Sequence, residues 1–473
     1  MDVSGLRFPQ MKKLVTEQQL RDRLAELGVD LPLDTEVDPA GALAQPLVVT
    51  DGSAGALTLA NRFAVLPMEG WDGTTDGRPT DLVRRRWGRF GRSGCGLVWG
   101  EATAVRPDGR ANPNQLVIDE TTVDEIAALR GLLDPGQVAG MQLTHSGRYA
   151  RPVDVPTPRT AYEHPILDGR VGAGAANVFT DEELDELAEQ YVAAAVLAQQ
   201  AGFAFVDVKH CHGYFLHELL SARNRPGPYG GDLAGRTRFL RTVTAGIRSR
   251  APGLAVAVRL SAFDLVPYRA GEGGVGEPDG SGPYAFGFGG DGTGLGIDLS
   301  ETHELLDVFE DLGIGLVSTT AGSPYYNPHI QRPAFFPPSD GYQPPEDPLV
   351  GVARQLAVTA ELRPRPSHAG GRGRRVLLLA GVAAPRRPGR GGRGRGCGGG
   401  PRPHDPVVPR ARGGRPRRSA HRAPPAVPHL QRLHHGAAGR CISGCFPIDP
   451  FYKEHPQRVE LTQAKKAAKA RLR

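Results

Sequence analysis

The sequence predicts an α/β fold, and more specifically a (β/α)8 TIM barrel. Six short apolar segments lack the period-two alternation of half-exposed strands, as is typical of parallel strands buried on both faces. Helical segments separate the six, and this alternation predicts a parallel sheet. Because six such units occur before residue 330, the pattern favours a closed barrel over an open sheet. The predicted strands are Phe63–Met68, Gly96–Thr103, Val138–Thr144, Ala204–Val208, Ala255–Leu260 and Leu316–Thr319.

The helix before the fourth predicted strand has the clearest boundaries. Thr180 is an N-cap residue and Glu183 follows three positions later, which together predict a capping box. Gly202 is expected to end the helix, because glycine adopts the left-handed conformation of a C-terminal cap at little cost. The apolar residues that share one face are Leu184, Leu187, Tyr191 and Ala195.

The predicted elements and the composition divide the sequence into four regions. Residues 1–58 are predicted to form a helical lead and a hairpin that turns at Asp51-Gly52, and residues 59–362 to form strands one to six of the barrel. Residues 363–440 are rich in Arg, Gly and Pro, and residues 441–473 form a separate C-terminal segment. Two long loops, Gly271–Gly296 and Ser323–Pro348, follow barrel strands and are therefore candidate walls of a substrate site.

Charge and cysteine content narrow the class of protein. The net charge of +6 arises from residues 363–440, which hold 19 arginines and one acidic residue, so the rest of the chain is net acidic and is not built to bind nucleic acid. The five cysteines are few and scattered, which is unlike a disulfide framework. No apolar run approaches the roughly 20 residues of a membrane-spanning helix. We therefore expect a cytoplasmic protein without a membrane partner.

Polar residues stand at the carboxyl ends of the predicted strands. In a barrel these ends converge on one mouth, so the set has the character of a site. A glutamine and an arginine suit a polar heterocycle, because an amide both donates and accepts and a cation stabilises developing negative charge. The residues are Pro67, Met68 and Glu69, then Glu101 and Ala102, then Gln142 and His145, then Lys209 to Tyr214, and Arg259.

Several motifs together resemble the Old Yellow Enzyme family of NADH:flavin oxidoreductases. They are NRFAVLPM, GLVWGEATAV, MQLTHSGRYA, HGYFLHELLSARNR with the nearby YGG, and VAVRLSAFD. They occur in order, and the match as a whole runs from about residue 55 to residue 362. The resemblance implies a TIM barrel that holds FMN at the carboxyl ends of its strands. It also implies that NADH or NADPH reduces the flavin, which then passes hydride to an electron-poor alkene in a small-molecule substrate, an ene-reductase reaction.

The resemblance assigns roles residue by residue. Lys209 and His212 match the pair that fixes the substrate carbonyl oxygen, although the family usually has an imidazole at the first position. Tyr214 matches the proton donor to the substrate carbon. Glu69 lies where some relatives carry a Cys or Thr that tunes the flavin potential. The residues expected to bind the cofactor are Pro67, Met68, Glu69, Ala102, Gln142 and Arg259.

Residues 363–440 cannot supply an ordinary seventh and eighth strand, since they contain no Phe, Tyr, Trp, Ile, Met, Asn, Lys or Glu. The resemblance resumes at Ile442, in ISGCFPIDPFYK. We interpret the segment as translated in the wrong frame between two compensating insertions or deletions. Codons can be chosen so that one shifted frame gives a seventh strand at Pro366–Val376 and a phosphate loop at Pro401–Ala411. We expect the chain as written to fold badly and bind FMN poorly.

Three other interpretations remain at this point. His210, Cys211, His212 and His217 could be metal ligands, but a second cluster with tetrahedral spacing is missing. A dienoyl-CoA-reductase-like flavoprotein would need an iron–sulfur cluster, for which Cys441 and Cys445 alone are insufficient. An RNA-binding tail would need interleaved aromatic residues, and none occurs between Tyr342 and Phe446. The sequence leaves the oligomeric state open, a homo-oligomer included.

Overall fold

The structure is a computed structural model that describes most of the first 363 residues. Within 8–363 the gaps are 10, 35, 37, 52–54, 281 and 335–341, and beyond them 376–379, 449–456 and 458–459 are described. The sequence predictions for the Arg-rich segment outside 376–379, and those for Cys397, Cys441 and Cys445, lie outside the described residues. Within the described part, no helix is long and apolar enough to cross a membrane.

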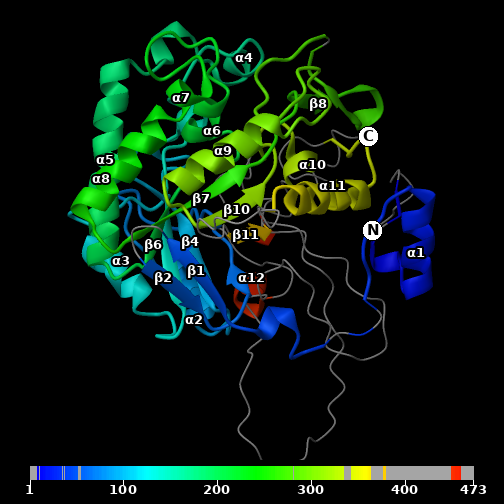
Figure 1. The fold of residues 1–473 in the computed structure, drawn as a ribbon, viewed down its shortest axis with the longest axis horizontal. Helices are drawn as coiled ribbons and strands as arrows, with labels where there is room; N and C mark the ends of the chain where they lie inside the picture. Colours follow the sequence, from blue (N-terminus) through cyan, green and yellow to red (C-terminus); the bar gives the residue numbers. More distant parts are fainter. Residues whose placement is uncertain are drawn as a thin grey trace, which may run out of the picture.

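A single parallel sheet forms the centre of the molecule (Figure 1). Its strands follow each other in chain order without reversal, which is the order of a barrel and differs from the reversed order of doubly wound sheets. All six predicted strands are confirmed, although the first is only two residues long. The strands are β3 (Ala64–Val65), β4 (Leu97–Ala104), β5 (Val138–Thr144), β6 (Phe205–Val208), β7 (Ala255–Ser261), β10 (Leu316–Thr320) and β11 (Val376–Leu379).

The strand β11 corrects one expectation for residues 363–440. It lies parallel to β10, with Leu316 opposite Val376, and takes the seventh position of the sheet. Its sequence, VLLL, is the longest apolar run of the Arg-rich segment, and pairing there covers the edge that β10 would otherwise expose. An eighth strand is not present among the described residues.

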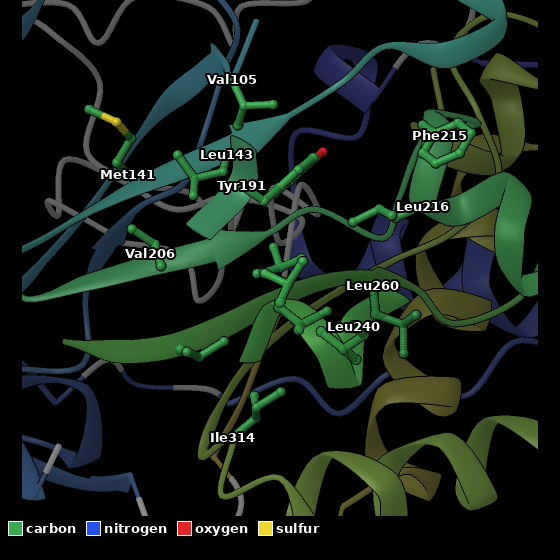
Figure 2. Packing of buried hydrophobic residues seen from close by; sticks show 14 of the residues in the cluster. Val105, Met141, Leu143, Tyr191, Val206, Phe215, Leu216, Leu240, Leu260 and Ile314 are labelled. Carbon is green, nitrogen blue, oxygen red and sulfur yellow. The ribbon is translucent and has the colours of Figure 1, made fainter. Parts of the chain in front are cut away.

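Helices connect successive strands and cover the outside of the sheet. The Thr180 capping box is confirmed, since the Thr180 side chain accepts from the Glu183 backbone N–H. Figure 2 shows side chains of β5, β6 and β7 packed with side chains of the covering helices in one cluster. The helices are α2 (Asp81–Gly91), α3 (Val123–Arg130), α4 (Leu167–Val171), α5 (Asp181–Gln200), α6 (Phe215–Leu220), α7 (Leu233–Arg236), α8 (Arg238–Arg250), α9 (Ser300–Asp311), α10 (Pro328–Gln331) and α11 (Pro348–Glu361).

A hairpin closes the amino ends of the barrel strands. It consists of β1 (Leu47–Asp51) and β2 (Gly55–Leu59), as predicted, and the turn residues 52–54 lie outside the described part. Val49 and Leu59 pack against the first inward-facing residues of the strands, among them Phe205. The amino end of the barrel is therefore apolar and closed, which leaves the carboxyl end for a site.

Two further segments dock on the barrel helices. The predicted N-terminal helix is α1 (Glu17–Glu26), whose Leu20 and Leu24 pack against Leu349 of α11 (Figure 1). In the C-terminal segment, α12 (Pro450–Glu454) follows Asp449, whose buried carboxylate accepts hydrogen bonds from Arg85 of α2. The loop Gly271–Gly296 contains β9 (Gly276–Pro278), which pairs with β8 (Tyr268–Ala270).

The apolar floor of the barrel provides a test of the fold. Phe205 is fully buried and meets Trp99 edge-on, with 5.2 Å between ring centroids. Phe205→Ala should lower the free energy of unfolding by about 3–5 kcal/mol, because it leaves a cavity in a packed interior. Leu132→Ala, at a side chain that is 42% exposed, should change it by less than about 0.5 kcal/mol. Chemical denaturation of both variants measures the difference, and equal effects would contradict the packing described here.

Candidate active site

The inward-facing side chains of the strands change from apolar to polar along the strand direction. Successive residues of a strand face opposite sides, so Phe205 and Asp207 of β6, and Lys209 directly after it, follow one another on the inner face. The register places Gln142 of β5 opposite Asp207. Ascending from the hairpin, the interior therefore changes from aromatic packing to a layer of buried charges.

Asp207 is the centre of that charged layer. One carboxylate oxygen, Oδ2, accepts from Trp99 Nε1 at 2.9 Å and from Gln142 Nε2 at 2.5 Å. The other, Oδ1, accepts from the backbone N–H of Arg259 at 2.8 Å. Asp207 is fully buried, and burial raises its pKa to about 6 against the opposing hydrogen bonds. Strands β4, β5 and β7, through Trp99, Gln142 and the backbone of Arg259, are thus hydrogen-bonded to one carboxylate.

Asp207 was not predicted as a site residue from the sequence. A signal was present, because an aspartate in the middle of the apolar segment Ala204–Val208 has to be paired when it is buried.

Arg259 lies at the carboxyl end of β7 with a buried guanidinium. Its Nη1 donates to the backbone carbonyl oxygen of Pro67 at 2.7 Å, which joins the ends of β7 and β3. Its Nε is buried and has no hydrogen-bond partner among the described residues. A buried N–H without an acceptor is costly, so this atom is suited to an acceptor on a bound group.

Lys209, Glu69 and Tyr214 form one cluster beside this layer. The Tyr214 hydroxyl donates to Glu69 Oε2 at 2.9 Å, and Lys209 Nζ is 3.9 Å from the same oxygen. Lys209 Nζ also lies 3.6 Å from the centre of the Tyr214 ring. Burial lowers the pKa of Lys209, and the Glu69 charge opposes that shift. Burial and the Glu69 carboxylate together raise the pKa of Tyr214 well above its usual value.

Aromatic side chains cover this cluster. Tyr325, from one of the two predicted wall loops, is within hydrogen-bond distance of Tyr214, with 2.8 Å between the hydroxyl oxygens. Tyr149 stacks on Tyr325 with 3.9 Å between ring centroids, and Trp71 Nε1 donates to Glu69 Oε1 at 2.7 Å. The loop Ser323–Pro348 therefore does contribute to the wall, whereas Tyr149 and Trp71 were not predicted.

His212 has the backbone conformation that most side chains avoid. Its φ is +67°, the sole positive φ at a non-glycine position in the described part of the chain. Ser261 and Ser323 hold it, since the His212 N–H donates to Ser261 Oγ and its carbonyl accepts from Ser323 Oγ. Such strain costs about 1–3 kcal/mol and is concentrated at functional sites. The turn places the His212 ring near Thr320, with 3.4 Å between Nε2 and Oγ1.

Of the other predicted residues, Glu101 and His145 serve the framework, whereas Ala102 and Met68 lie beside the site. The Glu101 carboxylate pairs with Arg86 at 2.6 Å, and the His145 ring packs between Phe179 and Phe215. Ala102 lies opposite Gln142 in the β4–β5 register, so it stays next to the charged layer, and Met68 is half-buried beside Pro67.

The metal-site interpretation finds no support in the described part of the chain. The ring nitrogens of two candidate ligands have backbone partners: His210 Nδ1 is 2.7 Å from the carbonyl oxygen of Val208, and His217 Nδ1 accepts from the Gly213 N–H. Within the described ranges, no group of three or more His, Cys, Asp or Glu residues is arranged to hold a metal ion.

Comparison with known proteins shows which family this part of the chain resembles. The sequence profile of the NADH:flavin oxidoreductase / NADH oxidase family matches residues 51–273, which include every strand end from β3 to β7. Residues 51–273 of the chain are therefore similar to this family. The family prediction from the sequence motifs is thereby confirmed, and FMN and NAD(P)H are the cofactor and reductant of the family.

Individual members of the NADH:flavin oxidoreductase family show the extent of the similarity. An NADH:flavin oxidoreductase of Gibberella zeae is 29% identical over 53% of this chain and 66% of its own length. An NADPH dehydrogenase of Bacillus subtilis is 29% identical over 48% of this chain and 65% of its own length. The matched part of this chain thus covers less than two thirds of the length of these relatives.

A solved structure supports the fold. Histamine dehydrogenase from Rhizobium sp. 4-9 superposes with a TM-score of 0.51 and 18% identity, over 74% of this chain and 43% of the other. At that identity the likeness concerns the fold alone.

The buried Asp207 predicts a pH dependence of stability. Its folded pKa of about 6 is above the unfolded value of about 3.9, so the folded state binds the extra proton between these values. Stability is therefore expected to fall as pH rises from about 4 to about 6, by about 3 kcal/mol from this group. Asp207→Asn should remove this part of the loss, and the exposed Asp124→Asn should not. The difference in the free energy of unfolding between pH 4 and pH 7 is measured for each chain. The same difference in Asp207→Asn as in the unsubstituted chain would contradict the role of Asp207 in this pH dependence.

Proposed function

We propose that the chain is an FMN-dependent oxidoreductase that uses NAD(P)H to reduce an electron-poor alkene. The observation that carries the proposal is the meeting of Arg259, Gln142, Lys209, His212 and Tyr214 at one end of the sheet, in the order that the family motifs assign. FMN, when bound, supplies the hydride that it takes from NAD(P)H.

The residues present fit a flavin ring. Arg259 offers a buried cation whose Nε lacks a partner within the described residues, and a flavin ring carries acceptor oxygen and nitrogen atoms. Gln142 presents an amide fixed by Asp207, and Pro67 is held in place through its carbonyl. We assign Arg259, Gln142, Pro67, Met68 and Ala102 to the cofactor. The phosphate site that the family resemblance places after strands seven and eight falls largely outside the described residues.

The remaining polar residues act on the substrate. Lys209 and His212 would hold the carbonyl oxygen, and each hydrogen bond would be strengthened by the exclusion of water from the buried cluster. Withdrawal of electrons through the carbonyl makes the β-carbon of the alkene an acceptor of hydride. Tyr214 would then give its hydroxyl proton to the α-carbon, which completes the addition of two hydrogens.

We assign Glu69 a role in the proton transfer from Tyr214, in addition to its position near the flavin. Its carboxylate accepts the Tyr214 hydroxyl hydrogen in the structure, and Tyr325 lies on the other side of the same hydroxyl. We infer that Glu69 positions Tyr214 and that the hydroxyl hydrogen leaves Glu69 when the substrate enters.

The assignment of Tyr214 is testable with FMN-loaded protein in which the codons of residues 363–440 are read in the shifted frame. Tyr214→Phe removes the proton donor and should slow reduction of a cyclic enone by about 10²-fold or more. Reduction of the bound flavin by NADPH should remain within about twofold, because that step does not use the tyrosine proton. Tyr229→Phe, away from this cluster, is the matched control. Single-turnover absorbance of the flavin separates the two steps; equal slowing of both would contradict the assigned role.

A further inference from the structure

Lys209 is unusual in the composition of the chain. Of 57 basic residues only seven are lysines, and Lys209 is the sole lysine between Lys13 and Lys453. The chain therefore uses arginine for almost every basic position of the barrel and an amine at the centre of the site. Arginine and lysine both supply positive charge, but only an amine readily loses its proton and becomes a nucleophile.

The surroundings of Lys209 favour proton exchange with its amine. Its side chain is 4% exposed at the end of β6, and Nζ is 3.9 Å from Glu69 Oε2. The same oxygen accepts from the Tyr214 hydroxyl at 2.9 Å. A carboxylate and a phenol thus stand beside one amine, so that a proton can be taken from the nitrogen and returned to a neighbouring oxygen.

We propose that Lys209 forms an imine with an aldehyde or ketone bound at this site. The neutral amine attacks the carbonyl carbon, a C–N bond forms, and the carbonyl oxygen takes up a proton to give a carbinolamine. The nitrogen loses two protons in all, and the Glu69–Tyr214 pair passes both to the oxygen: the first gives the carbinolamine hydroxyl, and the second is added as the C–O bond breaks and water leaves. The net change is loss of one water and gain of one C=N bond, without any oxidant or reductant.

Two opposing features of the site determine the protonation state of the Lys209 amine. The Tyr214 ring and the Glu69 carboxylate stabilise an ammonium, whereas burial favours the neutral amine and lowers the pKa of Lys209 overall. Each unit by which the pKa falls raises the neutral fraction at neutral pH about tenfold. Lys209 is therefore expected to react at a pH where exposed lysines are protonated.

This inference uses the carbonyl position of the proposed function, but it requires no flavin. A conjugated carbonyl held as a protonated imine would be a stronger hydride acceptor than the same carbonyl held by hydrogen bonds. Imine formation can nevertheless fail while flavin-dependent alkene reduction succeeds, so the two proposals are tested separately.

Reductive trapping tests the imine directly on the full chain. The protein is incubated at pH 7 with a slight excess of butanal and with cyanoborohydride, which reduces an imine to a stable secondary amine. Intact mass and peptide mapping then count and locate the adducts. We expect one butyl group per chain on Lys209, formed at least about tenfold faster than on the other lysines, which lie near the two ends of the sequence.

Two variants complete the test. Lys209→Arg keeps the charge and should lose the internal adduct, and Glu69→Gln should keep Lys209 but slow its trapping at least about tenfold, since the amide cannot carry a proton. Peptide mapping of the chain without substitutions, after the same treatment, tests the imine even where a variant does not fold. Adducts confined to the terminal lysines, or no adduct at all, would overturn the proposal.

Discussion

The carboxylate of Asp207 is the interaction on which the site depends. A charge in the middle of a barrel is tolerated only where hydrogen bonds replace the water it has lost. Trp99, Gln142 and the backbone of Arg259 supply them, and each comes from a different strand. Since the same bonds fix the Gln142 amide and the end of β7, the two groups assigned to the cofactor are oriented before any ligand arrives.

Above this layer the arrangement balances charge. The buried cations Lys209 and Arg259 lie near the carboxylates of Glu69 and Asp207, so several ionised groups can be buried together here. Replacing the family's usual imidazole by a lysine would be costly without an anion, and Glu69 provides one within 3.9 Å. The two departures from the family pattern, Lys209 and Glu69, are therefore best understood as one change.

Much of the fold could be predicted because its signals are local. Apolar runs predicted β4 to β7 and β10, and Thr180 predicted the start of α5, since strand burial and helix capping are properties of a few neighbouring residues. The convergence of Lys209, Gln142 and Arg259 followed from barrel topology. Asp207, Trp71 and Tyr149 were missed because their roles depend on partners far away in the sequence. The strand β11 was not predicted because the overall composition of residues 363–440 gave no weight to the four consecutive apolar residues Val376–Leu379.

The most direct test of this account is an FMN titration followed by flavin absorbance and fluorescence. Two chains are compared: the chain as written, and one in which the codons of residues 363–440 are read in the shifted frame. We expect the second to bind one FMN per chain and the first to bind it at least about a hundredfold more weakly, because the sequence as written lacks the phosphate loop that the family resemblance implies. Equal binding by both would contradict the frame interpretation. Failure of the second chain to bind FMN would contradict the central claim that these strand ends form a flavin site.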